Sequence, residues 1–308
     1  MGIPRWAVEV LACPRCGGGL EGLGRATLGV VRCASCGPYP VLAGVPVLVP
    51  EPASWCATFY DAALSALAEV GGATEAAVET LRAFAAAAPF AEPGRFSDDW
   101  TAWEADRRDA PDFVEGPAAA ALQHLVSVAE TQAPVAWLAA RAPSGVVLEV
   151  GCGAGRLTQA LTAPRRRVLV GDLSLRAVLL ASRAAKGAVP VVLEAQALPV
   201  APRSLDGLIA EHVVDLLDDA EAFFVSAQLA LSPKGTLLVA TPKPGLDSPD
   251  DDERRVEQLA RAAGLVVHER AEGLPWLRRN SARFLEVWLV QALALEHAGK
   301  RSARRRRA

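Results

Sequence analysis

Short apolar runs of about five residues recur through the second half of the chain, with segments of helical spacing between them. These runs occupy residues 146–150, 168–172, 190–194, 206–211, 235–241, 265–269 and 284–291. Strands that alternate with helices are typical of a parallel sheet that helices cover on both faces. The last two runs have no obvious long helix between them, so we expect that end of the sheet to be antiparallel. The pattern predicts an α/β fold with a seven-stranded, mostly parallel sheet.

The first half of the chain has a different pattern. Residues 55–92 are rich in alanine, and larger apolar residues recur there at helical spacing, which predicts two helices broken near Gly71 and Gly72. Further helices are expected at about 118–130 and 134–141. An apolar stripe on a helix usually faces a core. We therefore interpret residues 53–133 as a helical cover or linker.

Charge is unevenly distributed along the 308 residues. The formal net charge is −3, but six of the last nine residues are lysine or arginine, and we treat residues 300–308 as a basic tail. The remainder has 26 basic and 35 acidic residues, which is not typical of a general nucleic-acid binder. No apolar run is long enough to span a bilayer. The first residues lack the basic flank and apolar stretch of a signal peptide, so we expect a cytoplasmic protein with no membrane partner.

Four of the six cysteines lie in the first 36 residues and form two close pairs. Cys13 and Cys16 form one pair, and Cys33 and Cys36 form the other, each with C-x2-C spacing. Each pair makes a tight turn that directs two thiolates at one point, so two pairs complete the tetrahedron that Zn²⁺ prefers. Two disulfides are the alternative, but disulfides rarely persist in a reducing compartment. We therefore predict a zinc site that supplies most of the folding free energy of this small segment.

The residues around these cysteines resemble the zinc ribbon of the tRNA-methyltransferase activator family, over about residues 8–50. The residues that carry the resemblance are Leu11-Ala12-Cys13-Pro14, Tyr39-Pro40 and Gly44-Val45-Pro46-Val47-Leu48. It implies a ribbon that binds methyltransferases, as eukaryotic and archaeal members of that family do. The apolar run at residues 41–49 is too extensive for so small a domain to cover. We expect residues 1–52 to be a ribbon that docks on the methyltransferase domain of its own chain.

A glycine-rich turn follows the first run of the α/β part and opens a helix. Gly151, Gly153 and Gly155 occupy every second position, and Asp172 ends the next strand, 21 residues after Gly151. Glycines let a ligand approach the backbone, and a carboxylate in this place accepts hydrogen bonds from ribose hydroxyls. A dinucleotide loop has the spacing G-x-G-x-x-G, whereas Arg156 follows the third glycine here. The spacing therefore indicates a nucleoside ligand without a pyrophosphate.

At these positions the chain resembles class I S-adenosylmethionine-dependent methyltransferases, and it is most similar to their small-molecule "type 11" branch. The resemblance covers about residues 134–242. The resemblance implies a Rossmann-like domain, which we place at residues 134–299, and S-adenosylmethionine as the cofactor. It implies that the methionine part is held by Glu149, Gly151, Cys152, Gly153 and Gly155, the ribose by Asp172 with Leu173, and the adenine by Glu194, Ala195 and Gln196. The family usually has aspartate where this chain has Glu194.

The segment after the fourth strand contains the candidate for acid–base chemistry. Methyl transfer mainly requires that the nucleophile, the methyl carbon and the sulfur lie in line. A base is needed only where the nucleophile carries a proton. His212 is the best-placed base, because imidazole titrates near neutral pH, although a histidine that orients or packs against the cofactor is the alternative. Glu211 is expected to contact the methionine end. We expect Trp276 and Trp288 to belong to the core rather than to a ligand site.

Three functions fit this sequence. The first is a methyltransferase for a small-molecule acceptor, and the acidic body of the chain favours it. The second is an rRNA or tRNA methyltransferase that uses the ribbon to position its substrate, although phosphate binding needs clustered lysine and arginine. The third is a cofactor-binding scaffold without catalysis, whose ribbon recruits a partner. We expect the first, an enzyme that uses S-adenosylmethionine and carries zinc.

Overall fold

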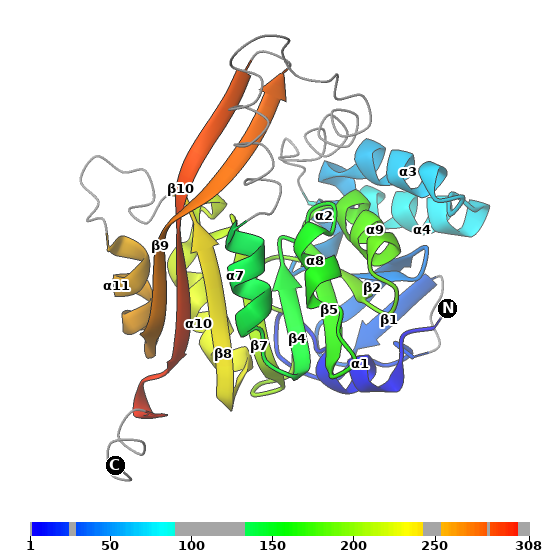
Figure 1. Ribbon diagram of the computed structural model, residues 1–308. Helices are drawn as coiled ribbons and strands as arrows, with labels where there is room; N and C mark the ends of the chain where they lie inside the picture. Colours follow the sequence, from blue (N-terminus) through cyan, green and yellow to red (C-terminus); the bar gives the residue numbers. More distant parts are fainter. Residues whose placement is uncertain (1, 25–28, 90–132, 243–253, 282–283, 301–308) are drawn as a thin grey trace.

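The computed structural model describes residues 2–24, 29–89, 133–242, 254–281 and 284–300 (Figure 1). Within these ranges one sheet of ten strands runs through the molecule in the order β1-β2-β3-β6-β5-β4-β7-β8-β10-β9. The strands are β1 (Gly29–Cys33), β2 (Gly37–Leu42), β3 (Val45–Leu48), β4 (Gly145–Val150), β5 (Arg166–Asp172), β6 (Val189–Leu193), β7 (Leu205–Glu211), β8 (Leu231–Thr241), β9 (Leu265–Ser281) and β10 (Phe284–His297).

The seven predicted strands are confirmed as β4 to β10, and the expected antiparallel end is formed by β10 between β8 and β9. The predicted strand count was wrong, because the sheet has ten strands rather than seven. The three additional strands come from the first 52 residues. β3 pairs in parallel with β6, with Val47 opposite Val192 and Leu48 opposite Leu193. Backbone pairing between such distant segments leaves no periodicity in the sequence, which is why the pattern did not predict it.

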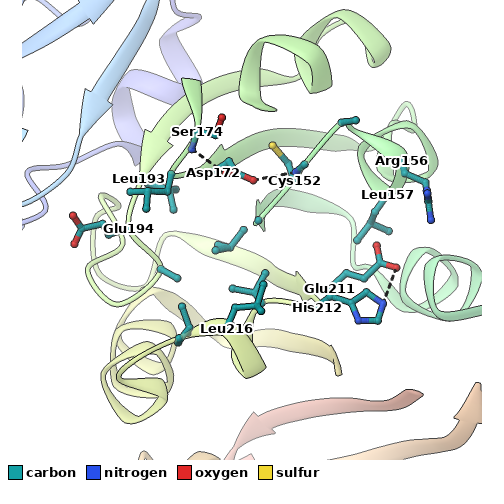
Figure 2. A pocket seen from close by; sticks show the side chains of 18 of the residues that line it. Cys152, Arg156, Leu157, Asp172, Ser174, Leu193, Glu194, Glu211, His212 and Leu216 are labelled. Atoms are coloured by element: carbon teal, nitrogen blue, oxygen red, sulfur yellow. Dashed lines mark hydrogen bonds and ion pairs between the residues drawn. The ribbon is translucent and has the colours of Figure 1, made fainter. Parts of the chain in front are cut away.

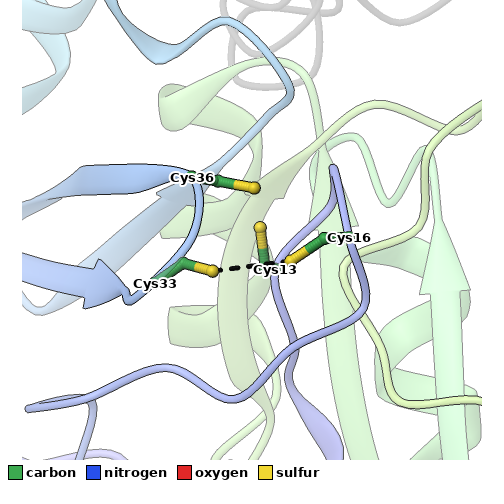
Figure 3. Close-up of side chains that lie close together, drawn as sticks. All are labelled: Cys13, Cys16, Cys33 and Cys36. Carbon is green, nitrogen blue, oxygen red and sulfur yellow. Dashed lines mark hydrogen bonds between the residues drawn. The ribbon is translucent and has the colours of Figure 1, made fainter.

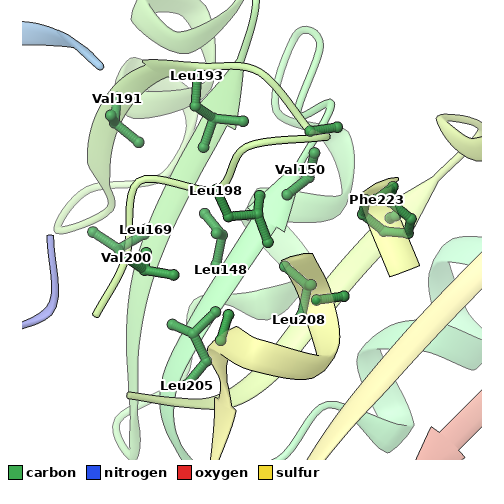
Figure 4. Packing of buried hydrophobic residues seen from close by; sticks show 14 of the residues in the cluster. Leu148, Val150, Leu169, Val191, Leu193, Leu198, Val200, Leu205, Leu208 and Phe223 are labelled. Atoms are coloured by element: carbon green, nitrogen blue, oxygen red, sulfur yellow. The ribbon is translucent and has the colours of Figure 1, made fainter. Parts of the chain in front are cut away.

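Helices cover both faces of the sheet, and each face has its own apolar core. α1 (Arg5–Val10), α10 (Ala220–Ala230) and α11 (Arg255–Ala262) pack on one face. The opposite face carries α2 (Pro52–Thr58), α3 (Tyr60–Glu69), α4 (Glu75–Ala86), α7 (Ala133–Arg141), α8 (Arg156–Leu161) and α9 (Leu175–Ala184). Figure 4 shows part of the first core, which contains Phe223 of α10 and the strand residues Leu148 and Leu208. Alternate strand residues point to opposite faces, so neighbouring residues on one strand belong to different cores.

The ribbon strands join this sheet through β3, and the apolar run at residues 41–49 is buried, as expected for a ribbon that docks on its own chain. Val47, Leu48 and Val49 are fully buried. A second connection lies next to α1, where the amide of Ala12 donates to the carbonyl of Pro199 and that of Ala201 donates to Val10. The docking expectation is therefore confirmed: the ribbon and the α/β part share one sheet.

β9 and β10 form a hairpin that extends past the end of β8 (Figure 1). Only residues 291–295 of β10 pair with β8, whereas residues 284–290 pair with β9 alone. We call the part of this hairpin at residues 273–290 the arm. It is much longer than the apolar runs at 265–269 and 284–291 predicted. A glycine, a proline and two arginines interrupt the apolar pattern of β9 after residue 272.

The break near Gly71 and Gly72 is confirmed between α3 and α4, and the helix expected at 134–141 is confirmed as α7. The helix expected at 118–130 and the tail after residue 300 lie outside the described residues. In the parts of the chain that the structure describes, no helix combines the length and apolar character that a membrane crossing needs.

Candidate active site and metal centre

A cavity of about 270 Å³ opens at the carboxyl ends of the central strands (Figure 2). Val150 ends β4, Asp172 ends β5, Leu193 ends β6 and Glu211 ends β7, and all four residues line it. β4 lies between β5 and β7, so the cavity is at the point where the chain switches direction across the sheet. Ligands of open α/β sheets bind at such points.

The glycine turn forms one wall of this cavity. Gly151, Gly153 and Gly155 all have positive φ, at 69°, 48° and 82°, which other residues adopt only with strain. A Cβ on Gly151 would lie 2.3 Å from Val213 Cγ2, and one on Gly155 would lie 2.6 Å from Ala181 Cα. The turn therefore requires glycine for its conformation and for its close packing, and it leaves backbone at the cavity wall.

Asp172 is held in place by the backbone around it. Its Oδ2 accepts a hydrogen bond from the amide of Gly153 at 3.1 Å, and its Oδ1 accepts one from the amide of Ser174 at 3.0 Å. Burial nevertheless raises its pKa, against these hydrogen bonds that favour the charged form. A carboxylate has about four acceptor positions, so the side chain keeps acceptor capacity on its cavity side.

Glu149 and Gly155 lie behind the cavity wall and not in it. Glu149 is 2% exposed, and its Oε2 accepts a hydrogen bond of 2.6 Å from the hydroxyl of Thr158. Burial raises the pKa of Glu149 to about 8. Gly155 caps the start of α8. The other nine predicted cofactor contacts line the cavity, namely Gly151, Cys152, Gly153, Asp172, Leu173, Glu194, Ala195, Gln196 and Glu211.

The ribbon side of the molecule is connected to this cavity at two points. β3 ends its pairing with β6 at Leu193, which is a wall residue. Trp55 of α2 donates a hydrogen bond from Nε1 to the carbonyl of Leu173 at 2.9 Å, and Leu173 is the residue after Asp172. Burial raises the pKa of Glu194, and the charge of Glu51 at the start of α2 raises it further. The ribbon and α2 therefore support the parts of the cavity wall that contain Leu173 and Leu193.

The opposite end of the cavity contains Glu211 and His212. His212 Nε2 lies 3.8 Å from Glu211 Oε1, which is too long for a hydrogen bond. Among the described residues, neither ring nitrogen of His212 has a hydrogen-bond partner, although both are buried. Its backbone has a positive φ of 53°. Burial raises the pKa of Glu211 to about 7, although the charge of Arg156 opposes the rise. Burial lowers the pKa of His212 to about 4, and Arg156 lowers it further.

Trp276 is a cavity residue that the sequence did not predict. It lies on β9, and its ring centroid is 4.2 Å from that of His212, with the two planes inclined by 32°. It also lines the cavity, whereas Trp288, the residue opposite it on β10, does not. Both tryptophans pack against the second core, as expected, but Trp276 also belongs to the candidate ligand site, which the expectation did not include. No local motif marks it, because only the length of the arm brings it to the site.

The four predicted zinc ligands lie together (Figure 3). Their sulfur atoms are all within 4.8 Å of one another, and the Sγ atoms of Cys16 and Cys33 are 3.5 Å apart. Zn–S bonds of about 2.3 Å in a tetrahedron place sulfur atoms about 3.8 Å apart, so the cluster fits one zinc ion. The hydroxyl of buried Tyr39 lies 3.1 Å from Cys13 Sγ. Gly17 and Gly37, which follow the two cysteine pairs, have positive φ, which the tight turns at the cysteines require.

The cavity residues also fit S-adenosylmethionine. The backbone of Gly151 and Gly153 faces a nucleoside-sized space, and the Asp172 carboxylate stands beside it. The buried nitrogens of His212, which lack partners among the described residues, indicate that polar ligand atoms complete this end of the site. An acidic residue at the end of the second strand of such a fold is the usual ribose acceptor.

Fold and site together define a Rossmann-like domain with a cavity at the switch point of its sheet. The family model described as a methyltransferase domain matches residues 148–239. The chain is 33% identical over 99 residues to a malonyl-[acyl-carrier protein] O-methyltransferase of Hahella chejuensis. This alignment covers 31% of this chain and 36% of that protein. It is 27% identical over 142 residues to a ubiquinone biosynthesis O-methyltransferase of Rhizobium etli, which covers 45% and 52%. The chain thus spans about a third to a half of the length of these relatives.

Among solved structures, this chain is similar to a protein chain from the complex between the Trm112 methyltransferase activator of Haloferax volcanii and a candidate methyltransferase. The two share 18% sequence identity, the alignment covers 65% of this chain and 98% of that one, and the TM-score is 0.46. A similarity of this size has no bearing on what this chain binds.

Proposed function

We propose that this protein is an S-adenosylmethionine-dependent methyltransferase that acts on a small-molecule acceptor. The observation that carries the proposal is the cavity at the switch point of the sheet, where the glycine turn after β4 and Asp172 at the end of β5 meet. The match of residues 148–239 to a methyltransferase domain supports the same reaction class.

The lining of the cavity supports a small molecule over RNA. Asp172, Glu194 and Glu211 are carboxylates, and of the described residues that line the cavity Arg156 alone is a cation. Binding of a phosphate backbone needs several clustered cations. The relatives named above are O-methyltransferases, which agrees with a hydroxyl or carboxyl oxygen as the methylated atom.

S-adenosylmethionine, when bound, supplies an activated methyl group, so the chain mainly has to bind, orient and exclude water. Asp172 holds the ribose, and the backbone of the glycine turn faces the methionine part. An acceptor hydroxyl must lose a proton to become methylated. Glu211 has a pKa near the working pH, which suits a general base, whereas His212 with its lowered pKa is a weak base. We assign the base to Glu211, and His212 acts as the hydrogen-bond partner that orients the acceptor.

The zinc ribbon supports the transferase within the same chain. Cys13, Cys16, Cys33 and Cys36 hold one zinc ion, which stabilises the strands that lead into β3. β3 then fixes the edge of β6, and α2 fixes the carbonyl of Leu173. Zinc in this centre is structural, because four cysteines leave no open coordination position.

A methyl-transfer assay tests the proposed reaction. The protein is incubated with S-adenosylmethionine labelled in the methyl group and with a cell extract that has been separated into metabolite, RNA and protein pools. We expect label in the metabolite pool, and much less label there with Asp172→Ala at the same cofactor concentration. Label in the RNA pool alone would contradict the small-molecule acceptor. Binding of S-adenosylmethionine without transfer to any pool would contradict catalysis and favour a scaffold.

A further inference from the structure

The arm supplies one wall of the cavity from outside the shared sheet. Trp276 reaches the cavity from a part of β9 that pairs only with β10. Its ring lies against His212 on the side of the cavity formed after β7. Apart from Glu211 at the end of β7, to which the general base is assigned, the cofactor contacts proposed above come from β4, β5 and β6 and the turns that follow them. Trp276 is therefore separate from the glycine turn and from the contacts proposed for the ribose and the adenine, and it lies at the end of the cavity that contains Glu211 and His212.

The side chains around this end are largely apolar. Val213, Leu216 and Leu217, which follow β7, line the same cavity as Trp276. Val213 packs against the glycine turn, because its Cγ2 fills the space that a Cβ on Gly151 would take. An aromatic ring and aliphatic side chains together favour a flat apolar ligand, since rings stack at centroid distances of about 4.5–7 Å and gain about 0.5–1.5 kcal/mol beyond burial.

His212 adds one polar requirement to this apolar end. Both of its ring nitrogens are buried and lack a partner among the described residues. A buried polar atom without a partner costs about 1–3 kcal/mol. A positive φ at a residue other than glycine adds backbone strain, and such strain tends to persist at functional sites. The ring of Trp276 holds the imidazole in this arrangement from one face. A ligand hydroxyl, which can both donate and accept, is the group that a neutral imidazole pairs with.

We propose that Trp276 is the acceptor-recognition residue of this enzyme and that the acceptor is a flat, largely apolar compound bearing a hydroxyl group, which stacks on Trp276 and hydrogen-bonds His212. The inference rests on the proposed function, since it assigns the acceptor for the same site. In the proposed step, the O–H bond of the acceptor breaks, its proton passes to Glu211, and the oxygen forms a bond to the methyl carbon as the carbon–sulfur bond breaks. The products are the methyl ether and S-adenosylhomocysteine.

The test uses two compounds of similar size that differ in flatness. 2-Naphthol is planar, and decahydro-2-naphthol has the same carbon skeleton and hydroxyl without a planar ring. Each is titrated by ligand-observed NMR into the full-length protein saturated with S-adenosylhomocysteine, whose own affinity is measured by calorimetry. We expect 2-naphthol to bind at least tenfold more tightly than decahydro-2-naphthol.

Two variants locate the effect. Trp276→Ala should weaken 2-naphthol binding at least tenfold and leave the affinity for S-adenosylhomocysteine within twofold, and Trp276→Phe should retain most of the binding. Trp288→Ala is the matched control, because Trp288 lies opposite Trp276 on the arm but does not line the cavity. It should leave 2-naphthol binding unchanged.

Equal binding of the two compounds, no binding of 2-naphthol, or unchanged binding in Trp276→Ala would overturn the proposal. An equal loss in Trp288→Ala would also overturn it, because the arm as a whole and not the Trp276 contact would then be responsible. If S-adenosylhomocysteine fails to bind the wild-type protein, the proposed function fails instead. The same 2-naphthol titration without S-adenosylhomocysteine then still decides whether Trp276 forms a site for flat compounds.

Discussion

Replacing Trp55 by phenylalanine tests whether the ribbon side of the molecule supports the cofactor site. Trp55 is 4% exposed, and its indole Nε1 donates to the carbonyl of Leu173 at 2.9 Å, next to Asp172. Phenylalanine preserves most of the packing but removes the donor, which leaves a carbonyl at the ribose side without this partner. Losing one partner of a buried hydrogen bond costs about 1–3 kcal/mol.

Part of this free-energy cost lowers the stability of the fold, and only the part that makes the segment around Asp172 less ordered lowers the affinity for S-adenosylhomocysteine. If about 0.7–1.4 kcal/mol does so, the dissociation constant for S-adenosylhomocysteine rises about three- to tenfold. Calorimetric titration of the wild-type and variant proteins at one pH and salt concentration measures it. The matched control is Trp6→Phe, since Trp6 lies on α1 and does not line the cavity. An affinity within 1.5-fold of wild type for Trp55→Phe, or an equal loss for Trp6→Phe, would refute the reasoning.

Three further predictions concern the metal and the buried carboxylates. Purified protein should contain about one zinc ion per chain. The double variant Cys13→Ser/Cys36→Ser should lose the zinc, and the whole protein should then unfold in one transition at a lower melting temperature. Two separate unfolding transitions would contradict the shared sheet. Burial raises the pKa of Glu149 from 4.5 to about 8, so the unfolded state loses this proton first and the stability of the ligand-free protein should fall as pH rises between those values, by up to about 5 kcal/mol. Urea unfolding at pH 5.5 and pH 8 should show about 3 kcal/mol of this loss for wild type and a smaller loss for Glu149→Gln; equal losses would exclude Glu149 as the source. The transfer rate should rise with pH through about 7 as Glu211, which faces His212, Arg156 and Glu149, loses its proton. Glu211→Gln should be at least a hundredfold slower and lack that rise; a rise that persists in the variant would exclude Glu211 as the base.

The central part of the fold could be predicted because its signals are local. Each of the strands β4 to β8 is a short apolar run, and the glycine turn with Asp172 has a spacing that its own backbone conformation requires. The four cysteines are similar, since two tight turns with fixed spacing bring four sulfur atoms together regardless of the rest of the chain. For these features, sequence neighbours determine geometry.

Features that depend on distant segments could not be predicted. The sequence indicated that residues 41–49 pack on something, but not that β3 pairs with β6 and extends the sheet, because edge pairing uses backbone groups that every residue has. The role of Trp276 depends on the length of the arm. Glu149 matches a motif, yet the structure places it behind the wall, where Thr158 is its hydrogen-bond partner. Whether a motif residue faces the ligand is decided by packing and not by spacing.

Calorimetric titration of S-adenosylmethionine into the full-length zinc-loaded protein tests the central claim most directly, that the cavity at the ends of β4 and β5 binds this cofactor through Asp172. We predict one site per chain, and an affinity that falls about ten- to a hundredfold in Asp172→Ala, because the loss of a charged hydrogen-bond acceptor costs about 1.5–3 kcal/mol. Unchanged affinity in the variant, no binding to the wild-type protein, or tighter binding of NAD than of S-adenosylmethionine would contradict the account.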